Sequence, residues 1–191
     1  MARKPGIELQ SIIQTSREIV DEEGIHALTL ATVAKKLSIR TPSLYNHIES
    51  LTALRKALAV HGLEALHHHL THSLGDQSGD NAIHAFSLAY IQFVRTHPGL
   101  YEATLWAGEG LVSPEAEKVT TRIVDMAVKL LNDYQLEGED AIHAARGLRS
   151  ILHGFASLDQ HHGFGLPVDL DISIKRMIDV FIAGIDKVKS K

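Results

Sequence analysis

Residues 29–48 constrain the possible fold more than any other stretch of the chain. Their apolar side chains fall at helical spacing on either side of a short polar break at residues 38–40. The run before the break consists of Leu30, Val33, Ala34 and Leu37, the run after it contains Leu44 and Ile48, and Ile39 lies between them. Side chains three and four residues apart share one face of a helix. The pattern predicts two short helices packed at a tight turn, with the small side chain of Ala34 allowing close approach.

The ends of these two helices carry residues that suit helix caps and first turns. Thr29 is placed to cap a helix over residues 30–37, whose N-terminal amides are suited to holding a phosphate. Thr41 is placed to cap a helix over residues 42–48, in which Pro42 takes the first position, where no amide donor is needed. This is the pattern of a helix-turn-helix, whose second helix lies in the major groove of DNA.

Polar and aromatic residues surround the outer face and the beginning of that second helix. The side chains expected to contact DNA are Thr29, Arg40, Thr41, Pro42, Ser43, Tyr45, Asn46 and His47. Arg, Asn, Ser and Thr side chains can read base edges, whereas Tyr and His side chains can reach phosphates. We therefore predict that Arg40 and Asn46 contact bases. Tyr45 and His47 are predicted to contact the DNA backbone.

The same region resembles the TetR family of transcriptional regulators. The residues that carry the resemblance are Gly24, Thr29, Val33, Ala34, Leu37, Ser38, Ile39, Leu44, Tyr45, His47 and Ile48. The family usually has Gly where Ser38 stands and often Lys where Leu51 stands. The resemblance covers residues 7–55 closely and implies a ligand-responsive repressor that binds a palindromic operator as a homodimer. The alternative is ordinary packing within a helical bundle, because apolar pairs at this spacing are common.

The rest of the chain is also predicted to be helical, which makes the fold class all-α. No segment alternates apolar and polar residues for long enough to indicate a strand. Nine helices are expected, over residues 7–23, 30–37, 42–48, 50–74, 80–96, 98–107, 114–134, 139–161 and 169–188. Gly24 is expected to end the first of them. We expect a three-helix DNA-binding domain over residues 1–50 and a helical regulatory and dimerisation domain over residues 51–191.

The C-terminal part resembles one subgroup of TetR-type regulators through the pair His153-Gly154, although the Trp that usually precedes this pair is absent. The family implies a pocket for a small apolar effector in this domain. Its candidate residues here are Phe86, Tyr90, Phe93, Tyr101, Leu105, Trp106, Met126, Leu130, His153 and Phe155. Packing in the core is the alternative for most of them. His153 stands out because an imidazole on an apolar face needs a partner, which a structural hydrogen bond would also supply.

The last two predicted helices carry apolar stripes wider than a surface helix needs. One stripe consists of Ala141, Ala144, Ala145, Leu148, Ile151, Leu152, Phe155 and Leu158, and the other of Ile174, Met177, Ile178, Phe181, Ile185 and Val188. The resemblance implies that these helices pair with their counterparts in a second copy to form a four-helix dimer interface. The alternative is that both stripes are core within one chain.

Composition limits the other classes of function. The chain has no cysteine, which excludes disulfides and thiolate metal sites. No apolar run approaches the length of a membrane span and no signal peptide is evident, so a cytoplasmic protein is expected. The net charge is −4, but residues 1–55 hold seven basic and six acidic side chains, against twelve and seventeen in the remainder. Basic residues gather at 3–4 and 35–40, which is compatible with a polyanionic partner.

Two rival functions are weaker. His67, His68, His69 and His72 suggest a metal site, because His68 and His72 share a helix face. No carboxylate in the same turn completes such a site, so we expect no bound metal and no cofactor. An enzyme is the other rival, but the chain has no phosphate-binding loop, no Gly-x-Ser-x-Gly and no His-Glu-x-x-His motif.

Overall fold

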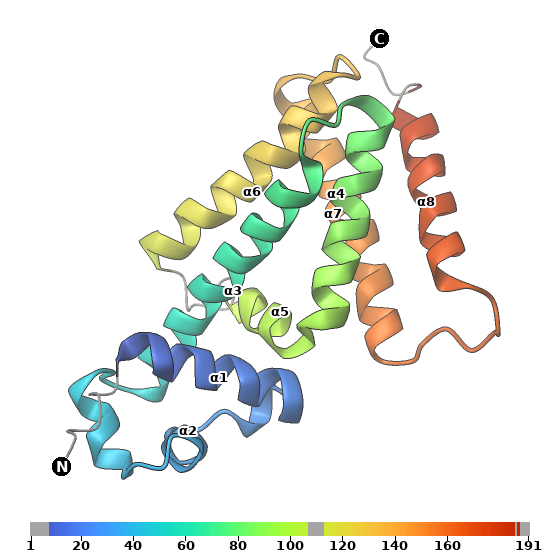
Figure 1. The fold of residues 1–191 in the computed structure, drawn as a ribbon. Helices are drawn as coiled ribbons and strands as arrows, with labels where there is room; N and C mark the ends of the chain where they lie inside the picture. The colour runs from blue at the N-terminus through green and yellow to red at the C-terminus, as the bar shows by residue number, and fades with distance from the viewer. Residues whose placement is uncertain (1–7, 107–112, 186, 188–191) are drawn as a thin grey trace. The chain divides into compact units, whose positions relative to one another are not determined.

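The computed structural model describes residues 8–106, 113–185 and 187, and its regular elements are helices (Figure 1). The described residues contain no strand, which confirms the predicted all-α class. The elements are α1 (Leu9–Glu23), η1 (Ile25–Ala27), α2 (Leu30–Lys36), η2 (Thr41–Asn46), α3 (Leu51–Leu74), α4 (Gly79–Thr96), α5 (Pro98–Leu105), α6 (Pro114–Asn132), α7 (Gly138–Gln160) and α8 (Leu170–Ile185), where η denotes a 3₁₀-helix.

Each of the nine predicted helices has a counterpart, and η1 is an additional short turn. The third predicted helix is the 3₁₀-helix η2. Gly24 ends α1 as predicted, with a positive φ of 83° and its amide donating to the carbonyl of Val20 at 3.1 Å. Some sequence-based predictions lie outside the described residues, namely those for Arg3, Lys4, Ile7, residues 107–112 and Val188.

The chain divides into two compact units, called here unit 1 and unit 2. Unit 1 consists of residues 1–65 and 97–119, and unit 2 of residues 66–96 and 120–191. The first part of α3 and the whole of α5 therefore pack with the N-terminal helices, although α5 follows them by some 50 residues of chain. The boundary predicted at residue 50 separates a DNA-binding part from a regulatory part, whereas these two units are defined by packing alone. The predicted boundary therefore stays a prediction.

Unit 1 has an apolar core, whose side chains recur at helical spacing with exposed polar residues between them. Its fully buried side chains include Ile12, Ile19, Leu28, Val33, Leu44, Leu54, Leu58 and Leu100. Ser16 is also buried, and its hydroxyl donates to the carbonyl of Ile12 at 2.7 Å, which satisfies this buried polar group. This core joins α1, α2 and η2 to α3 and α5.

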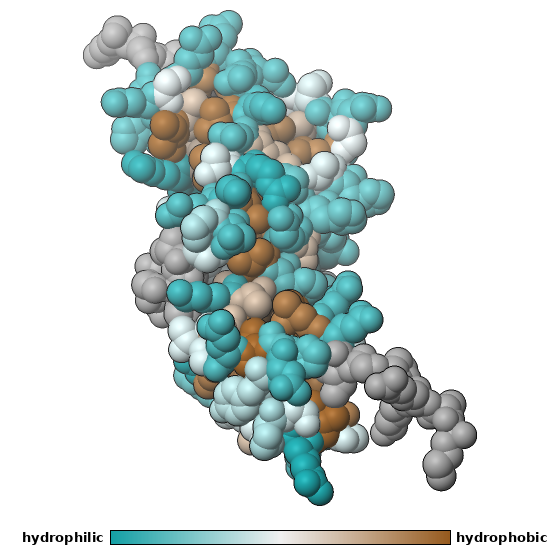
Figure 2. Space-filling view, turned by 90° about the vertical axis from the view of Figure 1, so that its left-hand side faces the viewer, coloured by the Kyte–Doolittle hydropathy of each residue, from teal (hydrophilic) through white to brown (hydrophobic). Residues whose placement is uncertain are grey.

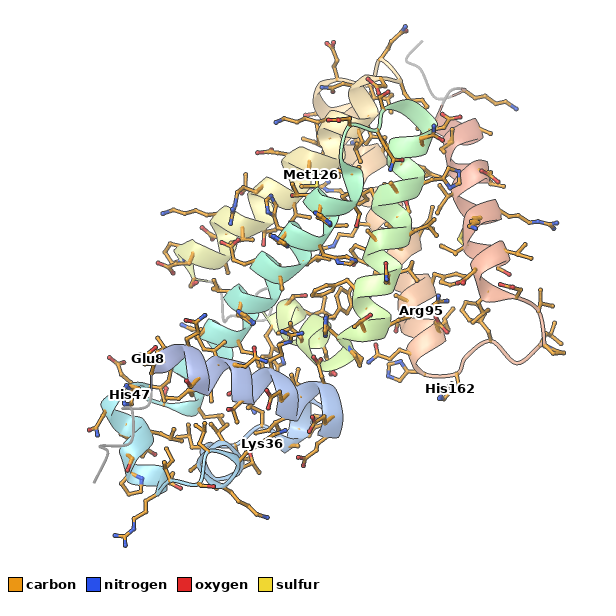
Figure 3. The ribbon with its side chains drawn as sticks, in the orientation of Figure 1. Glu8, Lys36, His47, Arg95, Met126 and His162 are labelled. Carbon is orange, nitrogen blue, oxygen red and sulfur yellow. The ribbon has the colours of Figure 1, made fainter. Side chains whose placement is uncertain are left out.

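In unit 2, α4 packs against both α7 and α8 (Figure 1). The shared core includes Leu70, Ile83, Ile91, Leu131, Leu148, Leu152, Ile174 and Ile178. At its edge Arg95, labelled in Figure 3, donates from Nε to Asp159 on α7 and from Nη1 to Asp171 on α8, each at 2.6 Å. A second pair joins His84 on α4 to Asp179 on α8 at 2.9 Å.

None of the helices in the described ranges is long and apolar enough to cross a membrane. The face drawn in Figure 2 is mainly hydrophilic, with apolar residues scattered over it. Scattered exposed apolar residues are usual on protein surfaces.

Candidate nucleic-acid interface

The N-terminus of α2 is fixed by a reciprocal capping box. The hydroxyl of Thr29 accepts from the amide of Thr32, and the hydroxyl of Thr32 accepts from the amide of Thr29, both at 3.0 Å. The Thr32 hydroxyl also lies 2.8 Å from the carbonyl oxygen of Ala27. The predicted cap at Thr29 is confirmed, and it ties the beginning of α2 to the turn before it.

The turn between α2 and η2 depends on an unusual backbone conformation at Ser38. Its φ is +56°, in the left-handed region that favours glycine. The amide of Ile39 donates to the carbonyl of Ala34 at 3.0 Å, which closes the end of α2. Glycine adopts this conformation without steric cost, whereas Ser adopts it here at a cost of roughly 1–2 kcal/mol.

Beneath the turn the predicted packing is present. The inward-facing residues Val33, Ala34, Leu44 and Ile48 are all buried. Leu44 is the buried residue of η2, and α2 packs directly against η2. The inner side of the segment is therefore fixed, which sets the direction in which its outer side chains project.

The predicted cap at Thr41 is wrong. The residue before the helix is Arg40, in an extended conformation, and Thr41 is the first residue of η2. The shift has a local cause: the amide of Ser43 bonds to the carbonyl of Arg40 at 2.9 Å, a three-residue spacing that starts a 3₁₀-helix one position early. Pro42 still occupies the first turn, where its missing amide leaves no hydrogen bond unmade.

The outer face of this segment is open to solvent. Arg40, Pro42, Tyr45, Asn46 and His47 are exposed, as is Thr29 at the start of α2, whereas Thr41 and Ser43 are half-buried. Tyr45 is 56% exposed, so a binding partner can reach its ring and hydroxyl. His47 follows η2 directly (Figure 3). The sequence positions 40–47 thus form one accessible surface built on buried anchors.

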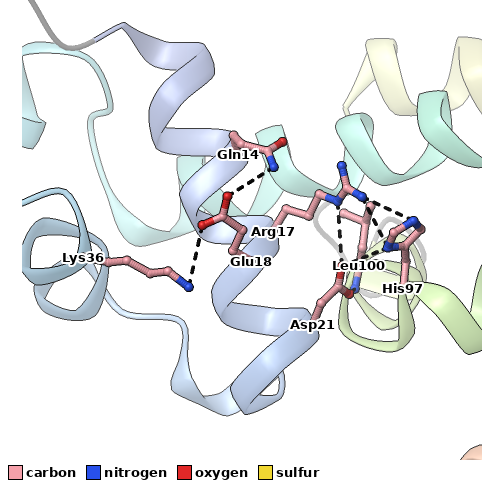
Figure 4. A network of polar contacts seen from close by, with 7 residues as sticks. All are labelled: Gln14, Arg17, Glu18, Asp21, Lys36, His97 and Leu100. Atoms are coloured by element: carbon pink, nitrogen blue, oxygen red, sulfur yellow. Dashed lines mark hydrogen bonds and ion pairs between the residues drawn. The ribbon is translucent and has the colours of Figure 1, made fainter.

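A salt bridge between helices holds α2 to α1. Lys36 Nζ lies 2.7 Å from Glu22 Oε2. It also lies 3.6 Å from Glu18 Oε2, the pair drawn in Figure 4. The hydrogen bond with Glu22 raises the pKa of Lys36 above its usual value. Glu22 and Glu18, for which no role was predicted, therefore help to hold α2 against α1. No local pattern could have shown this, because the partners are 14 residues apart on different helices.

The effector candidates fall into two groups. Tyr101, Leu105 and Trp106 belong to unit 1, and the other seven belong to unit 2: Phe86, Tyr90, Phe93, Met126, Leu130, His153 and Phe155. Phe86, Tyr90, Phe93, Tyr101 and Phe155 are buried, and Trp106, Met126 and His153 are half-buried. Trp106 lies in unit 1 under the guanidinium of Arg55, with 5.2 Å between Cζ and the ring centroid. The ten candidates are thus divided between the two compact units.

The C-terminal stripes divide between core and surface. Ile174, Ile178 and Ile185 on α8 are buried in the core of this chain, so the interpretation of the whole stripe as a dimer interface is wrong for these three. A second set of apolar residues on α7 and α8 remains exposed: Ile142, Leu158, Ile172, Met177 and Val180. Phe181 is half-buried, and its ring lies 3.6 Å from the position a Cβ at Gly147 would take.

The four histidines that suggested a metal site, His67, His68, His69 and His72, all lie on α3. Within the described ranges, no three His, Cys, Asp or Glu side chains are grouped closely enough to hold a metal ion.

Two short helices joined by a tight turn, with buried apolar residues beneath and exposed polar residues above, define a helix-turn-helix DNA-binding protein. Comparisons with known proteins agree. The model of the family described as "Tetracyclin repressor-like, C-terminal domain" matches residues 83–181. The HTH-type transcriptional regulator YobS of Bacillus subtilis (strain 168) is 38% identical over 187 residues, covering 97% of this chain and 96% of that protein.

A second relative, an HTH-type transcriptional regulator of Mycobacterium tuberculosis (strain H37Rv), is 30% identical and covers 98% of this chain and 85% of its own length. Among solved structures, a TetR variant from Acinetobacter baumannii AYE in complex with minocycline has the same fold. Its TM-score is 0.71 at 20% identity, covering 97% of this chain and 99% of that one. The protein belongs to the TetR family of helix-turn-helix transcriptional regulators.

Proposed function

We propose that the protein is a ligand-responsive repressor that binds a palindromic operator as a homodimer. The observation that carries the proposal is the exposed segment 40–47, which rests on the buried side chains of Leu44 and Ile48. Arg40 and Asn46 would read base edges, while Tyr45 and His47 would contact phosphates. The half-buried Thr41 and Ser43 would approach the DNA at the start of η2, together with Pro42. Thr29 would present the first turn of α2 to the backbone.

The proposed dimer forms through α7 and α8. Met177, Val180 and Gly184 are spaced three and four residues apart, so they share one face of α8, and all three are exposed. Exposed apolar residues gathered on one helix face are the usual mark of an interface. A twofold dimer would supply two copies of η2, which a palindromic operator requires.

The proposed effector is a small, largely apolar molecule that binds in unit 2. Phe86, Tyr90, Phe93 and Phe155 would supply an apolar lining, with Met126 and His153 half-buried at its margin. The structural neighbour from A. baumannii was solved in complex with minocycline, which supports a small-molecule effector for this chain. Tyr101 and Trp106 remain candidates in unit 1. We propose a binding function without catalysis, carried out in the cytoplasm, where bacterial DNA is found.

The decisive test is the selection of bound fragments from a random DNA pool by the purified protein. We expect one sequence with twofold symmetry and half-site centres about 10–10.5 base pairs apart, or a small multiple of that spacing. Recovery of a single, unrepeated half-site would contradict the homodimer. Recovery of no preferred sequence would contradict operator recognition.

A further inference from the structure

Three acidic residues in a row end α1, at a place where the helix alone would disfavour them. Asp21, Glu22 and Glu23 lie in its last turn, which contains no basic residue. The C-terminus of a helix carries the partial negative charge of the helix dipole, so carboxylates there weaken an isolated helix. Contacts outside α1 can offset this cost, and the three residues differ in the contacts they make.

Two of the three acidic residues hold another helix of unit 1. Asp21 Oδ1 accepts from the amide of Leu100 in the first turn of α5 at 2.8 Å (Figure 4). Glu22 contacts α2, where its Oε2 lies 2.7 Å from Nζ of Lys36. Glu23 is exposed and forms neither an ion pair nor a side-chain hydrogen bond within the described part of the chain. Glu22 and Glu23 thus carry the same charge one residue apart, and only Glu22 has a partner.

A second carboxylate completes the contact with α2. Glu18, one turn before Glu22, lies 3.6 Å from Lys36 Nζ, and its other oxygen accepts from Nε2 of Gln14 at 3.3 Å (Figure 4). One ammonium group therefore meets two carboxylates from successive turns of α1. We call Glu18, Glu22 and Lys36 the carboxylate clamp. An isolated exposed ion pair contributes little to stability, but a network in which one charge has several partners contributes more.

The carboxylate clamp holds the end of α2 that leads into the exposed segment 40–47. Lys36 is the last residue of α2, which has only seven residues, of which Val33 and Ala34 are buried. Ser38, with its φ of +56°, follows two residues later, and η2 begins at Thr41. A helix this short has few contacts that set its angle on α1, so the clamp acts directly on the start of the turn.

We propose that Glu18 and Glu22 are positioning residues for operator recognition, which hold Lys36 so that the segment 40–47 meets DNA in one orientation. The inference rests on the proposed operator binding and concerns unit 1 alone. Reading of bases requires side chains within hydrogen-bond geometry of the base edges, whereas nonspecific binding depends mainly on charge. Loss of the clamp should therefore reduce the preference for the operator and not the general attraction to DNA.

Glu22→Gln in the full-length protein separates this role from a simple effect of charge, because the two predict opposite signs. Removing a carboxylate lessens the repulsion of DNA phosphates, so charge alone predicts tighter binding. We expect Glu22→Gln to weaken binding to the selected operator at least about threefold, with binding to a scrambled duplex of the same length unchanged or tighter. Glu23→Gln, the matched control, makes the same change of charge and should keep the wild-type ratio of the two affinities. Equal ratios in the two variants would overturn the proposal.

An exchange of charges tests the contact itself. Lys36→Glu should also lower the ratio of operator to scrambled affinity, because it places a third carboxylate beside two others. Adding Glu22→Lys restores an opposite pair and should bring the ratio back to within about twofold of wild type. A double variant no better than Lys36→Glu alone would overturn the proposal.

The wild-type protein separates the two possible failures. If it prefers an operator and Glu22→Gln keeps that preference, the carboxylate clamp has no positioning role while operator recognition stands. If it prefers no DNA sequence, the proposed function is wrong, and this inference falls with it.

Discussion

At the scale of single residues, the exposed segment 40–47 divides into side chains that read bases and side chains that contact phosphates. Asn46→Ala should cost about 1–3 kcal/mol at one base position and relax the preference there, because a bidentate contact to a base edge is lost. Tyr45→Phe should weaken binding to all sequences alike, because a phosphate contact carries no sequence information. Fluorescence anisotropy with the operator and with single-base variants measures both effects.

Gln10→Ala, an exposed change on α1, serves as the control for these two variants. It should leave affinity and sequence preference unchanged. Should Asn46→Ala weaken every DNA sequence to the same extent, Asn46 is a phosphate contact and the assignment of base reading to it is incorrect.

His61 should make the stability of the protein depend on pH. Burial, and secondly the charge of Arg17, lower its pKa below the ordinary value of 6.5. Its Nε2 is buried and has no hydrogen-bond partner among the described residues, so nothing compensates for the charged form. As pH falls below about 6.5, the unfolded chain takes up a proton at this residue before the folded chain does. Folding stability should therefore fall with pH in that range, and this contribution should be absent above it.

Urea unfolding of wild type and His61→Asn at about pH 7.5 and about pH 5 measures this contribution. The wild-type protein should lose more free energy of unfolding between the two pH values than the variant loses. The other histidines are common to both proteins, so their titration cancels in the comparison. An equal or larger loss in the variant would show that His61 does not titrate in this way.

At the scale of elements, the turn between α2 and η2 carries a strain that one substitution should relieve. Ser38 holds a φ of +56°, which glycine adopts without steric cost. Ser38→Gly should raise the free energy of unfolding by about 1 kcal/mol, offset in part by the greater entropy of glycine in the unfolded chain. Ser43→Gly, inside η2, is the matched control and should lower stability. Chemical denaturation measures the free energy of unfolding of these proteins. A less stable Ser38→Gly protein would mean that the Ser38 side chain contributes more to stability than its strained backbone costs.

The elements themselves were predictable because their signals are local. Apolar spacing located the helices, Gly24 marked the end of α1, and Thr29 marked the start of α2. The buried anchors Leu44 and Ile48 followed from the same spacing. The 3₁₀ character of η2 could not be predicted from this spacing. The choice between three- and four-residue hydrogen bonds depends on small energy differences that no residue pattern records.

Contacts between distant segments were beyond the reach of the sequence. Nothing near Asp21 indicates that it caps α5, because its partner Leu100 is distant in the chain and donates a backbone amide, which every residue but proline possesses. The same holds for the division of the α8 stripe. Periodicity identified it as apolar, but only the packing of α4 and α7 against α8 decides which residues, such as Ile174 and Ile178, are core.

At the scale of the whole molecule, the proposed operator recognition requires two copies of the chain, and the exposed face of α8 offers the means to test this. Val180 is 72% exposed, so Val180→Asp should leave the fold of one chain intact while placing a charge in the proposed interface. We expect the variant to be monomeric at concentrations where the wild-type protein is dimeric. Operator affinity should fall steeply when the dimer is lost, because a single η2 contacts only one half-site.

Val124→Asp is the control for this experiment, since Val124 is an exposed valine on α6, outside the proposed interface. It should keep the mass and the operator affinity of wild type. Sedimentation velocity gives the mass, and circular dichroism establishes that both variants remain helical. The dependence on concentration separates two causes of weak binding: a monomer that still recognises DNA should regain affinity as its concentration rises, whereas a damaged helix-turn-helix should not. A Val180→Asp protein that sediments as a dimer and binds the operator normally would place the interface on another face of the chain.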